Sequence, residues 1–175
     1  MDPQQPLDPM TVHESRLDRA LRALLVQQRV AALGTLGEQG QPFVSMVPFA
    51  VWAESAALVI HVSLLAPHTR NLLGDPRVSV MVQQPEVAGE PVHALPRVSI
   101  DALARRLGPG SDDWLAARGV YLARFPEAQP MTELGDFSFV ALQPTLARHV
   151  AGFGSARPLD ADAMGQVLRL SAHPQ

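Results

Sequence analysis

The sequence predicts an α+β fold, an antiparallel β-barrel of six or seven short strands with three or four flanking helices. Three observations lead to this prediction. Short apolar runs, some of them alternating with period two, are bounded by glycine and proline turns, which is typical of strands. Segments with apolar residues at helical spacing are inserted between these runs. The strands neither alternate regularly with helices nor follow dinucleotide-binding order, which favours an antiparallel barrel over a parallel sheet.

The chain has room for one well-filled core. It holds 175 residues, of which 47% are hydrophobic and 18% are charged, and this length is short for two full-sized domains. We therefore expect a single domain over residues 13–175. Residues 1–12 contain three prolines and two aspartates and lack the basic and apolar regions of a secretory signal. We expect them to be a disordered leader.

The N-terminal elements are a helix and a hairpin. Thr11 and Glu14 stand at capping-box spacing, and the leucines of residues 17–28 share one helical face, which predicts a helix of about four turns. Two apolar runs within residues 30–52 then flank a glycine-containing turn at 37–40. This pattern predicts a β-hairpin.

The next segment predicts strand, helix and strand. Residues 58–63 (LVIHVS) form a short apolar run that is typical of a buried strand. Pro67 suits the first turn of a helix over 67–73, which ends at the Gly-Asp-Pro sequence that follows. Residues 77–83 alternate apolar and polar side chains, so they predict a strand with one buried face.

A loop, a strand and a capped helix come next. Residues 84–95 contain two prolines and a glycine and predict a loop, after which residues 96–103 favour a strand. Ser111 with the acidic pair that follows it suits a helix N-terminus, and this helix should end at Phe125 and Pro126.

The C-terminal segment predicts two strands and a helix. The strands are expected at 136–142 and 145–153, separated by a turn at Gln143 and Pro144. A last helix is expected after Asp160.

Missing residue types exclude several chemistries. The chain has no cysteine, which removes disulfides, thiolate nucleophiles and Cys-ligated metals and suits a reducing cytoplasm. It also has no lysine, so Schiff-base and Walker-type phosphate chemistry are excluded. A net charge of −3 gives no indication of nucleic-acid binding, and no apolar run approaches the roughly 20 residues that span a bilayer.

The histidines do not predict a metal site, because none has a partner at metal-ligand spacing. His61 lies between apolar residues and is interpreted as a half-buried strand residue. His149 is expected at a solvated strand end, with a position near a cofactor as the alternative. No arrangement of Ser, His and Asp or of paired carboxylates identifies catalytic residues.

One segment has the composition of an anion site. Residues 67–71 (PHTRN) combine a helix N-terminus with an imidazole, a hydroxyl and a guanidinium within one turn. Backbone N–H groups and charge-assisted hydrogen bonds at such a position suit a phosphate. The alternative interpretation is an ordinary helix start on a solvated turn.

Four stretches in order resemble a known family: LGTLGEQGQPFVSMVPFAV, LVIHVSLLAPHTRNLLGDPRVSVMV, LPRVSI and YLARFPEAQPMTELGDFSFVALQPTLARHVAGFGSA. This set is similar to the FMN-binding split-barrel family related to pyridoxamine 5′-phosphate oxidase, and in particular to its branch of HugZ-type haem-utilisation proteins. The resemblance runs from about Arg16 to Leu159. Its most specific parts are residues 63–79 and 136–156.

The resemblance implies a homodimer with FMN at the subunit interface, acting as an oxidoreductase on a small-molecule substrate. The residues that it places along the flavin ring are Ser45, Met46, Val47 and Pro48. The residues that it places near the phosphate are Ser63, His68, Thr69, Arg70 and Asn71. Arg97 is implied as a contact from the partner's strand.

The chain departs from the oxidases of this family in one motif. Oxidases that act on pyridoxamine phosphate use an Arg-Lys pair on the phosphate, and here Pro67 and His68 align with that pair. We therefore do not expect this particular activity. The alternative function is that of a haem-binding or haem-utilisation protein with the same fold and without flavin turnover.

Overall fold

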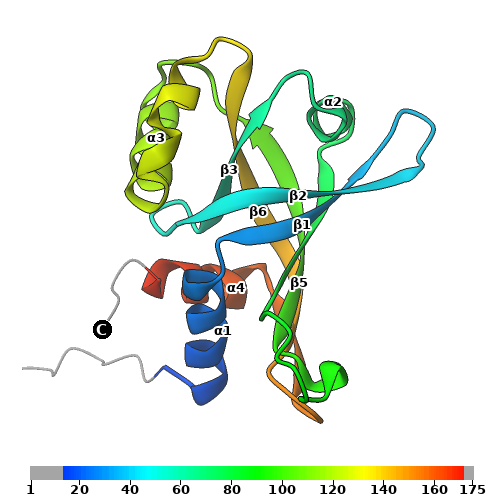
Figure 1. The fold of residues 1–175 in the computed structure, drawn as a ribbon. Helices are drawn as coiled ribbons and strands as arrows, with labels where there is room; N and C mark the ends of the chain where they lie inside the picture. The colour runs from blue at the N-terminus through cyan, green and yellow to red at the C-terminus, as the bar shows by residue number, and fades with distance from the viewer. Residues whose placement is uncertain (1–13, 172–175) are drawn as a thin grey trace, which may run out of the picture.

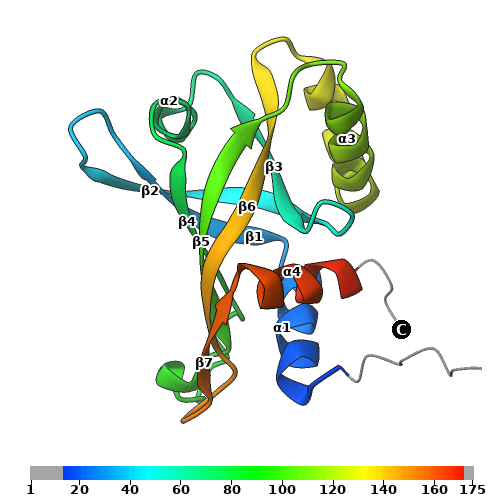
Figure 2. The same ribbon diagram turned by 180° about the vertical axis from the view of Figure 1, so that it is seen from behind.

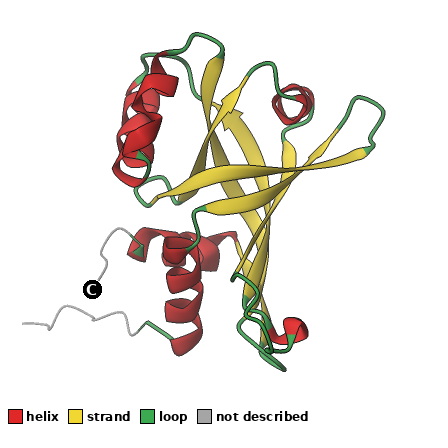
Figure 3. Ribbon diagram, viewed as in Figure 1, coloured by secondary structure: helices red, strands yellow, loops and turns green. Residues whose placement is uncertain are grey.

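The computed structural model describes residues 14–171, and Figures 1 and 3 show the arrangement of its elements. Within this range the strands are β1 (Val30–Leu36), β2 (Pro42–Trp52), β3 (Ala57–Ser63), β4 (Arg77–Gln83), β5 (Arg97–Arg106), β6 (Phe137–Val150) and β7 (Ala156–Asp160). The helices are α1 (Arg16–Gln27), α2 (Pro67–Gly74), α3 (Asp112–Arg124) and α4 (Ala161–Leu170), with 3₁₀ segments at Val92–Ala94 and Pro126–Glu133.

The strands form a closed antiparallel barrel with one added strand. The sheet order is β3-β2-β1-β4-β5-β6-β7, and a further pairing of β3 with β6 closes the first six strands into a barrel. β6 is long enough to pair with β3 near its start and with β7 near its end. Figure 2 shows it crossing the molecule beside β5. The predicted α+β split barrel is therefore confirmed.

Strand alternation and three helices build the main core inside the barrel. Val78, Val80 and Val82 of β4 are buried while the residues between them are exposed, as their period predicts. Leucines of α1 and apolar residues of α4 close one end of this core, and Leu72 of α2 contributes at the other. Because side chains fill the barrel interior, a ligand has to bind on the outer surface or at an end of the barrel.

A second core lies outside the barrel, under α3. Phe139, on the outer side of β6, has no exposed surface and packs against Tyr121 and Trp114 of α3, with ring centroids 5.6 and 5.5 Å away. Ser111 caps α3 as predicted, since its Oγ accepts a hydrogen bond from the Trp114 N–H at 3.2 Å. One outer face of the barrel is thus covered by a helix.

The opposite outer face carries apolar side chains without a cover. Register places Met46, Ala32 and Met81 in one cross-strand row, and Val44 and Gly34 in the next. The large apolar residues exposed on this face are Val30, Val44, Met46, Met81, Leu103 and Leu146. We call this surface, formed by β1, β2, β4, β5 and the second half of β6, the uncovered face.

The start of the first helix differs from the prediction. Thr11 and the leader 1–12 lie outside the described residues. The N-cap of α1 is Ser15, whose Oγ accepts from the Asp18 N–H at 3.1 Å. Glu14 instead pairs with Arg22, eight residues further along the chain, at 2.8 Å.

The predicted turn at Gln143 and Pro144 is wrong, since β6 continues through it as one strand. A register shift between Asp101 and Ala102 of β5 accommodates Pro144, which has no N–H to donate to the ladder. β6 ends at Val150, three residues earlier than expected. A loop with Gly154 at φ 74° then leads into β7, which the sequence did not predict.

Candidate functional site

The barrel is split beside the first half of β2. From Pro42 to Pro48 this strand pairs with β1, whereas its ladder with β3 begins only at Phe49. Over the described residues, the second backbone edge of 42–48 therefore has no strand partner. α2 lies at this gap, between β3 and the β1–β2 hairpin (Figure 1). An open strand edge beside a helix start leaves backbone N–H and C=O groups for a ligand.

The four predicted residues of β2 face two directions. Ser45 is opposite Leu33, which is fully buried, and Val47 is itself buried, so this pair belongs to the barrel interior. Met46 is 65% exposed and belongs, with Pro48, to the uncovered face. A ligand on the uncovered face would meet Met46 and Pro48 but not the other two side chains.

Several predicted phosphate contacts already bind protein groups. Ser63 Oγ donates to Asp136 Oδ2 at 3.2 Å and accepts from the Leu65 N–H. Asn71 Nδ2 donates to Thr35 Oγ1 at 3.1 Å, which ties α2 to β1. These contacts give Ser63 and Asn71 structural roles in the loop and at the barrel end.

The remaining groups of this segment are less committed. Arg70 is exposed, and one of its terminal nitrogens donates to the Leu65 carbonyl at 3.1 Å. Thr69 is fully buried, and its Oγ1 has no hydrogen-bond partner among the described residues. Burial lowers the pKa of His68, so this half-buried imidazole is uncharged at neutral pH. Arg70 is therefore the charged group that the predicted cradle offers to an anion.

Two adjoining hollows lie near this segment. An apolar one of about 550 Å³ opens on the uncovered face between the hairpin and β4–β5, with Val44 and Leu103 in its wall. A polar one of about 520 Å³ includes Arg70 and Asn71. The two share Leu36 and Arg77, so a single ligand with an apolar body and an anionic end could occupy both.

Arg77 is a site residue that the sequence reasoning missed. Its guanidinium pairs with Asp75 at 2.6 Å and lowers the pKa of that carboxyl to about 2. The side chain is 72% exposed, so it can also contact a ligand at the shared wall. The sequence does contain a signal for Arg77. It is the first outward residue of an alternating strand and directly follows the predicted helix of the anion site.

Arg97 lies away from the other predicted residues. It begins β5 beside the loop of residues 84–96, at the end of the sheet opposite α2 (Figure 1). Its guanidinium donates to the Leu95 carbonyl at 2.9 Å and to the His93 carbonyl at 3.4 Å. Within one chain it is therefore not brought together with the phosphate segment, and its role as a contact from a partner stays a prediction.

Two histidines are more buried than the sequence suggests. His149 is 1% exposed, so the expected solvated strand end is wrong: its cross-strand neighbour Val98 is an interior residue, and the His149 side chain shares that face. Burial first, and the nearby Arg157 second, lower its pKa. His61 is 6% exposed under α3, and burial lowers its pKa to about 4.

The sequence profile of the Pyridoxamine 5′-phosphate oxidase family matches residues 17–151, which include all six strands of the closed barrel. The chain belongs to this family. Across the described residues, no group of three or more metal-ligating side chains gathers, and no helix is long and apolar enough to cross a membrane. A cytoplasmic location and the absence of nucleic-acid binding stay predictions.

Similar proteins carry names connected with haem. The chain is 30% identical over 158 residues to the haem oxygenase HutZ of Vibrio cholerae, covering 90% of this chain and 89% of that protein. The structure of a haem-binding protein from Mycobacterium smegmatis superposes with a TM-score of 0.78 at 30% identity, over 89% of this chain and 62% of that one. A crystal structure of HutZ from Vibrio cholerae, described as a haem storage protein, superposes with a TM-score of 0.69 at 29% identity, over 74% of this chain and 91% of that one. This supports the expected HugZ-like branch.

Proposed function

We propose that this chain binds haem and acts in haem utilisation, and that it does so as a homodimer through the uncovered face. The observation that carries the proposal is the similarity to HutZ, which extends over nearly the whole of both chains. The fit of the hollows to the chemistry of haem supports it independently.

Haem combines a flat apolar ring with two carboxylates at one edge. The apolar hollow offers Leu36, Val44 and Leu103 to a ring, and the adjoining polar hollow offers the guanidinium groups of Arg70 and Arg77 to carboxylates. Arginine suits this task, because its fork of N–H groups matches a carboxylate. Bound haem would supply iron-centred chemistry with oxygen. In a storage protein, the chain would hold the haem without turnover.

The iron ligand must come from outside these two hollows. Haem iron in proteins is held by His, Cys, Met or Tyr, and the chain has six histidines and no cysteine. No histidine in the described range lines either hollow. The candidates are therefore a histidine brought by a second copy, one of the two outside the described residues, or the exposed Met46 or Met81.

The homodimer is supported by the uncovered face itself. Monomeric proteins rarely leave a contiguous apolar surface of this kind on a sheet, and Val44 and Met46 are 68% and 65% exposed. A two-fold dimer would pair this face with the same face of a second copy. The hollow would then lie between subunits, which encloses a ligand on both sides.

FMN is the second candidate, and the unpartnered Ser45 and Thr69 hydroxyls favour it. Both are buried at the split, beside the open edge of β2, and buried hydroxyls ordinarily have partners. In this case Arg70, Thr69 and His68 would hold the phosphate, and backbone groups of 45–48 would meet the ring. FMN would supply electron transfer to or from a small-molecule substrate.

Parallel titrations distinguish the two candidates. Hemin and FMN are each added to the purified protein, unbound ligand is removed by gel filtration, and the ligand retained per chain is measured from absorbance. Our proposal predicts retained hemin with a Soret band, and a shift of that band in one variant among the six His→Ala changes, Met46→Ala and Met81→Ala. Retained FMN that is lost on joint substitution of His68→Ala and Thr69→Ala, without hemin binding, would instead establish the second candidate. Retention of neither would contradict both.

A further inference from the structure

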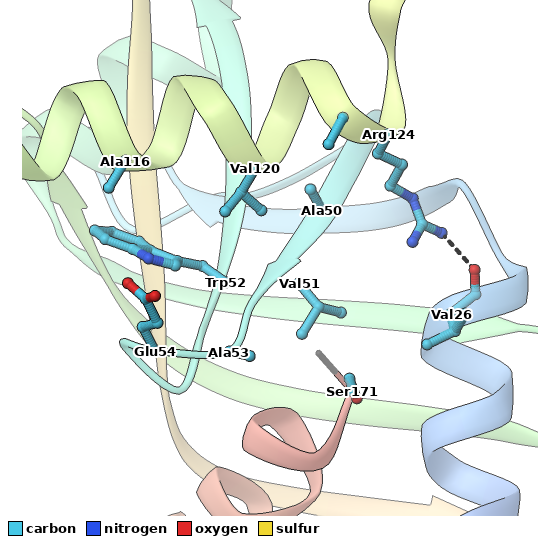
Figure 4. Close-up of a pocket in the computed structure, with 11 residues that line it drawn as sticks. Val26, Ala50, Val51, Trp52, Ala53, Glu54, Ala116, Val120, Arg124 and Ser171 are labelled. Carbon is cyan, nitrogen blue, oxygen red and sulfur yellow. Dashed lines mark hydrogen bonds between the residues drawn. The ribbon is translucent and has the colours of Figure 1, made fainter. Parts of the chain in front are cut away.

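A groove on another side of the molecule has polar groups that the proposed function does not use. Its floor is the end of β2 and the turn after it, one wall is α3, and the other is formed by the C-terminal ends of α1 and α4 (Figure 4). The volume is about 710 Å³, which lies within the range of small-molecule sites. It shares no lining residue with the two hollows near α2.

Small side chains keep the middle of the groove open and apolar. Ala50 and Val51 lie on the floor, and Ala116 and Val120 project from α3 above them, as Figure 4 shows. Ala116 and Arg124 are eight residues apart on this helix, so the groove extends about 12 Å along it. This shape suits an elongated apolar body.

One end of the groove presents a guanidinium with unused donors. Nη2 of Arg124 donates to the carbonyls of Leu25, Val26 and Gln28 at the C-terminal end of α1, with the Val26 distance at 3.0 Å. Nη1 has no hydrogen-bond partner among residues 14–171 and is not a buried atom. Figure 4 shows it on the side away from Val26, toward the groove. A carboxylate is the natural partner of such a group.

The other end presents a buried donor beside a carboxylate. Trp52 is 3% exposed, and its indole Nε1–H has no partner among the described residues. Leaving a buried donor unpaired costs about 1–3 kcal/mol, so an acceptor at this position would be stabilised. Glu54 is exposed at the rim next to the indole (Figure 4). The negative charge of Glu54 disfavours an anionic acceptor here. It favours a hydroxyl group, whose oxygen can accept from the indole while its O–H donates a hydrogen bond to the Glu54 carboxylate.

We propose that this groove binds an apolar monocarboxylate that carries a hydroxyl at its far end, such as an ω-hydroxy fatty acid. The carboxylate lies at Arg124, the chain lies along α3, and the hydroxyl accepts from the Trp52 indole and donates to Glu54. The two ends of the groove thus select for a ligand with one charge and one neutral oxygen.

Calorimetric titration with three probes tests the ligand class. The probes are 10-hydroxydecanoate, decanoate and decanedioate, added to the full chain. We expect 10-hydroxydecanoate to bind at one molecule per chain, about 3- to 10-fold tighter than decanoate, because one hydrogen bond is added. Decanedioate should bind weaker than decanoate, since its second carboxylate meets Glu54. No saturable binding, or a preference for decanedioate, would overturn the proposal.

Variants on α3 and β2 test the position. Ala123→Phe fills the groove from an exposed helix position and should abolish binding, whereas Leu115→Phe adds the same ring on α3 outside the groove and should leave it unchanged. Trp52→Phe keeps the aromatic packing but removes the donor, so the preference for 10-hydroxydecanoate over decanoate should disappear. Unchanged binding in Ala123→Phe, or a preference that persists in Trp52→Phe, would place the ligand elsewhere.

Discussion

The two outer faces of the barrel are built from the same alternating strands but end in different environments. Under α3, Phe139 and Tyr121 are almost completely buried and pack in an aromatic cluster with His61. On the uncovered face, residues such as Met46 and Val44 occupy equivalent outward positions and remain about two-thirds exposed. The face under α3 therefore stabilises the fold of the single chain. The apolar residues of the uncovered face would be buried only when a ligand or a second chain binds there.

The largest effect should come from emptying the covered face. Phe139→Ala removes a ring that has no exposed surface and lies 4.4 Å from His61 and 5.5 Å from Trp114, centroid to centroid. We expect a loss of about 3–5 kcal/mol in the free energy of unfolding, measured by urea denaturation. Val44→Ala on the uncovered face, where the residue is 68% exposed, should cost under about 1 kcal/mol in dilute protein. Equal losses would contradict the difference between the faces.

The second-largest effect should come from acid, which protonates His61 under α3 and lowers the free energy of unfolding. Burial lowers the pKa of His61 to about 4 from 6.5, so the unfolded chain binds this proton first as pH falls. Stability should therefore decline between pH 6.5 and 4, by up to about 3 kcal/mol from this group. His61→Phe should reduce the decline without removing it, because burial also lowers the pKa of His149. A variant whose unfolding free energy falls as steeply with acid as the wild type would refute this origin.

Charges on the uncovered face should prevent self-association. The double variant Met46→Glu with Met81→Glu places carboxylates in one row, which a two-fold dimer would bring against the same row of a second copy. We expect the dissociation constant of the dimer, measured by sedimentation equilibrium, to rise at least about 100-fold, which corresponds to about 2.7 kcal/mol. Leu115→Glu, on the exposed side of α3, is the control and should leave the association state unchanged. A wild-type monomer at all concentrations would contradict the proposed dimer.

The sequence predicted the parts of this fold that local signals determine. Period-two alternation located β4, the glycines located the hairpin turn, and Pro67 and Ser111 located the starts of α2 and α3. The continuity of β6 could not be predicted in this way. It depends on a bulge at Asp101, about 40 residues earlier in the chain, because only the partner strand determines whether a proline is tolerated.

The candidate site shows the same limit. The residue types of 63–71 indicated an anion site, but the binding of Ser63 to Asp136 and of Asn71 to Thr35 joins residues 73 and 36 positions apart. The division of Ser45 and Met46 between the interior and the uncovered face follows strand parity once the register with β1 is known. These properties arise from pairing and packing across the chain, and no local pattern carries them.

The smallest effect concerns the N-cap of α3, the helix that covers one face of the barrel. Ser111→Ala removes the oxygen that accepts from the Trp114 N–H, and we expect a loss of about 1 kcal/mol in the free energy of unfolding. Ser111→Asp retains an acceptor at a helix N-terminus and should restore most of this stability. Neither change should alter self-association, because α3 and the uncovered face lie on different sides of the barrel. A change in association on loss of this cap would mean that the helix-covered face also takes part in the dimer.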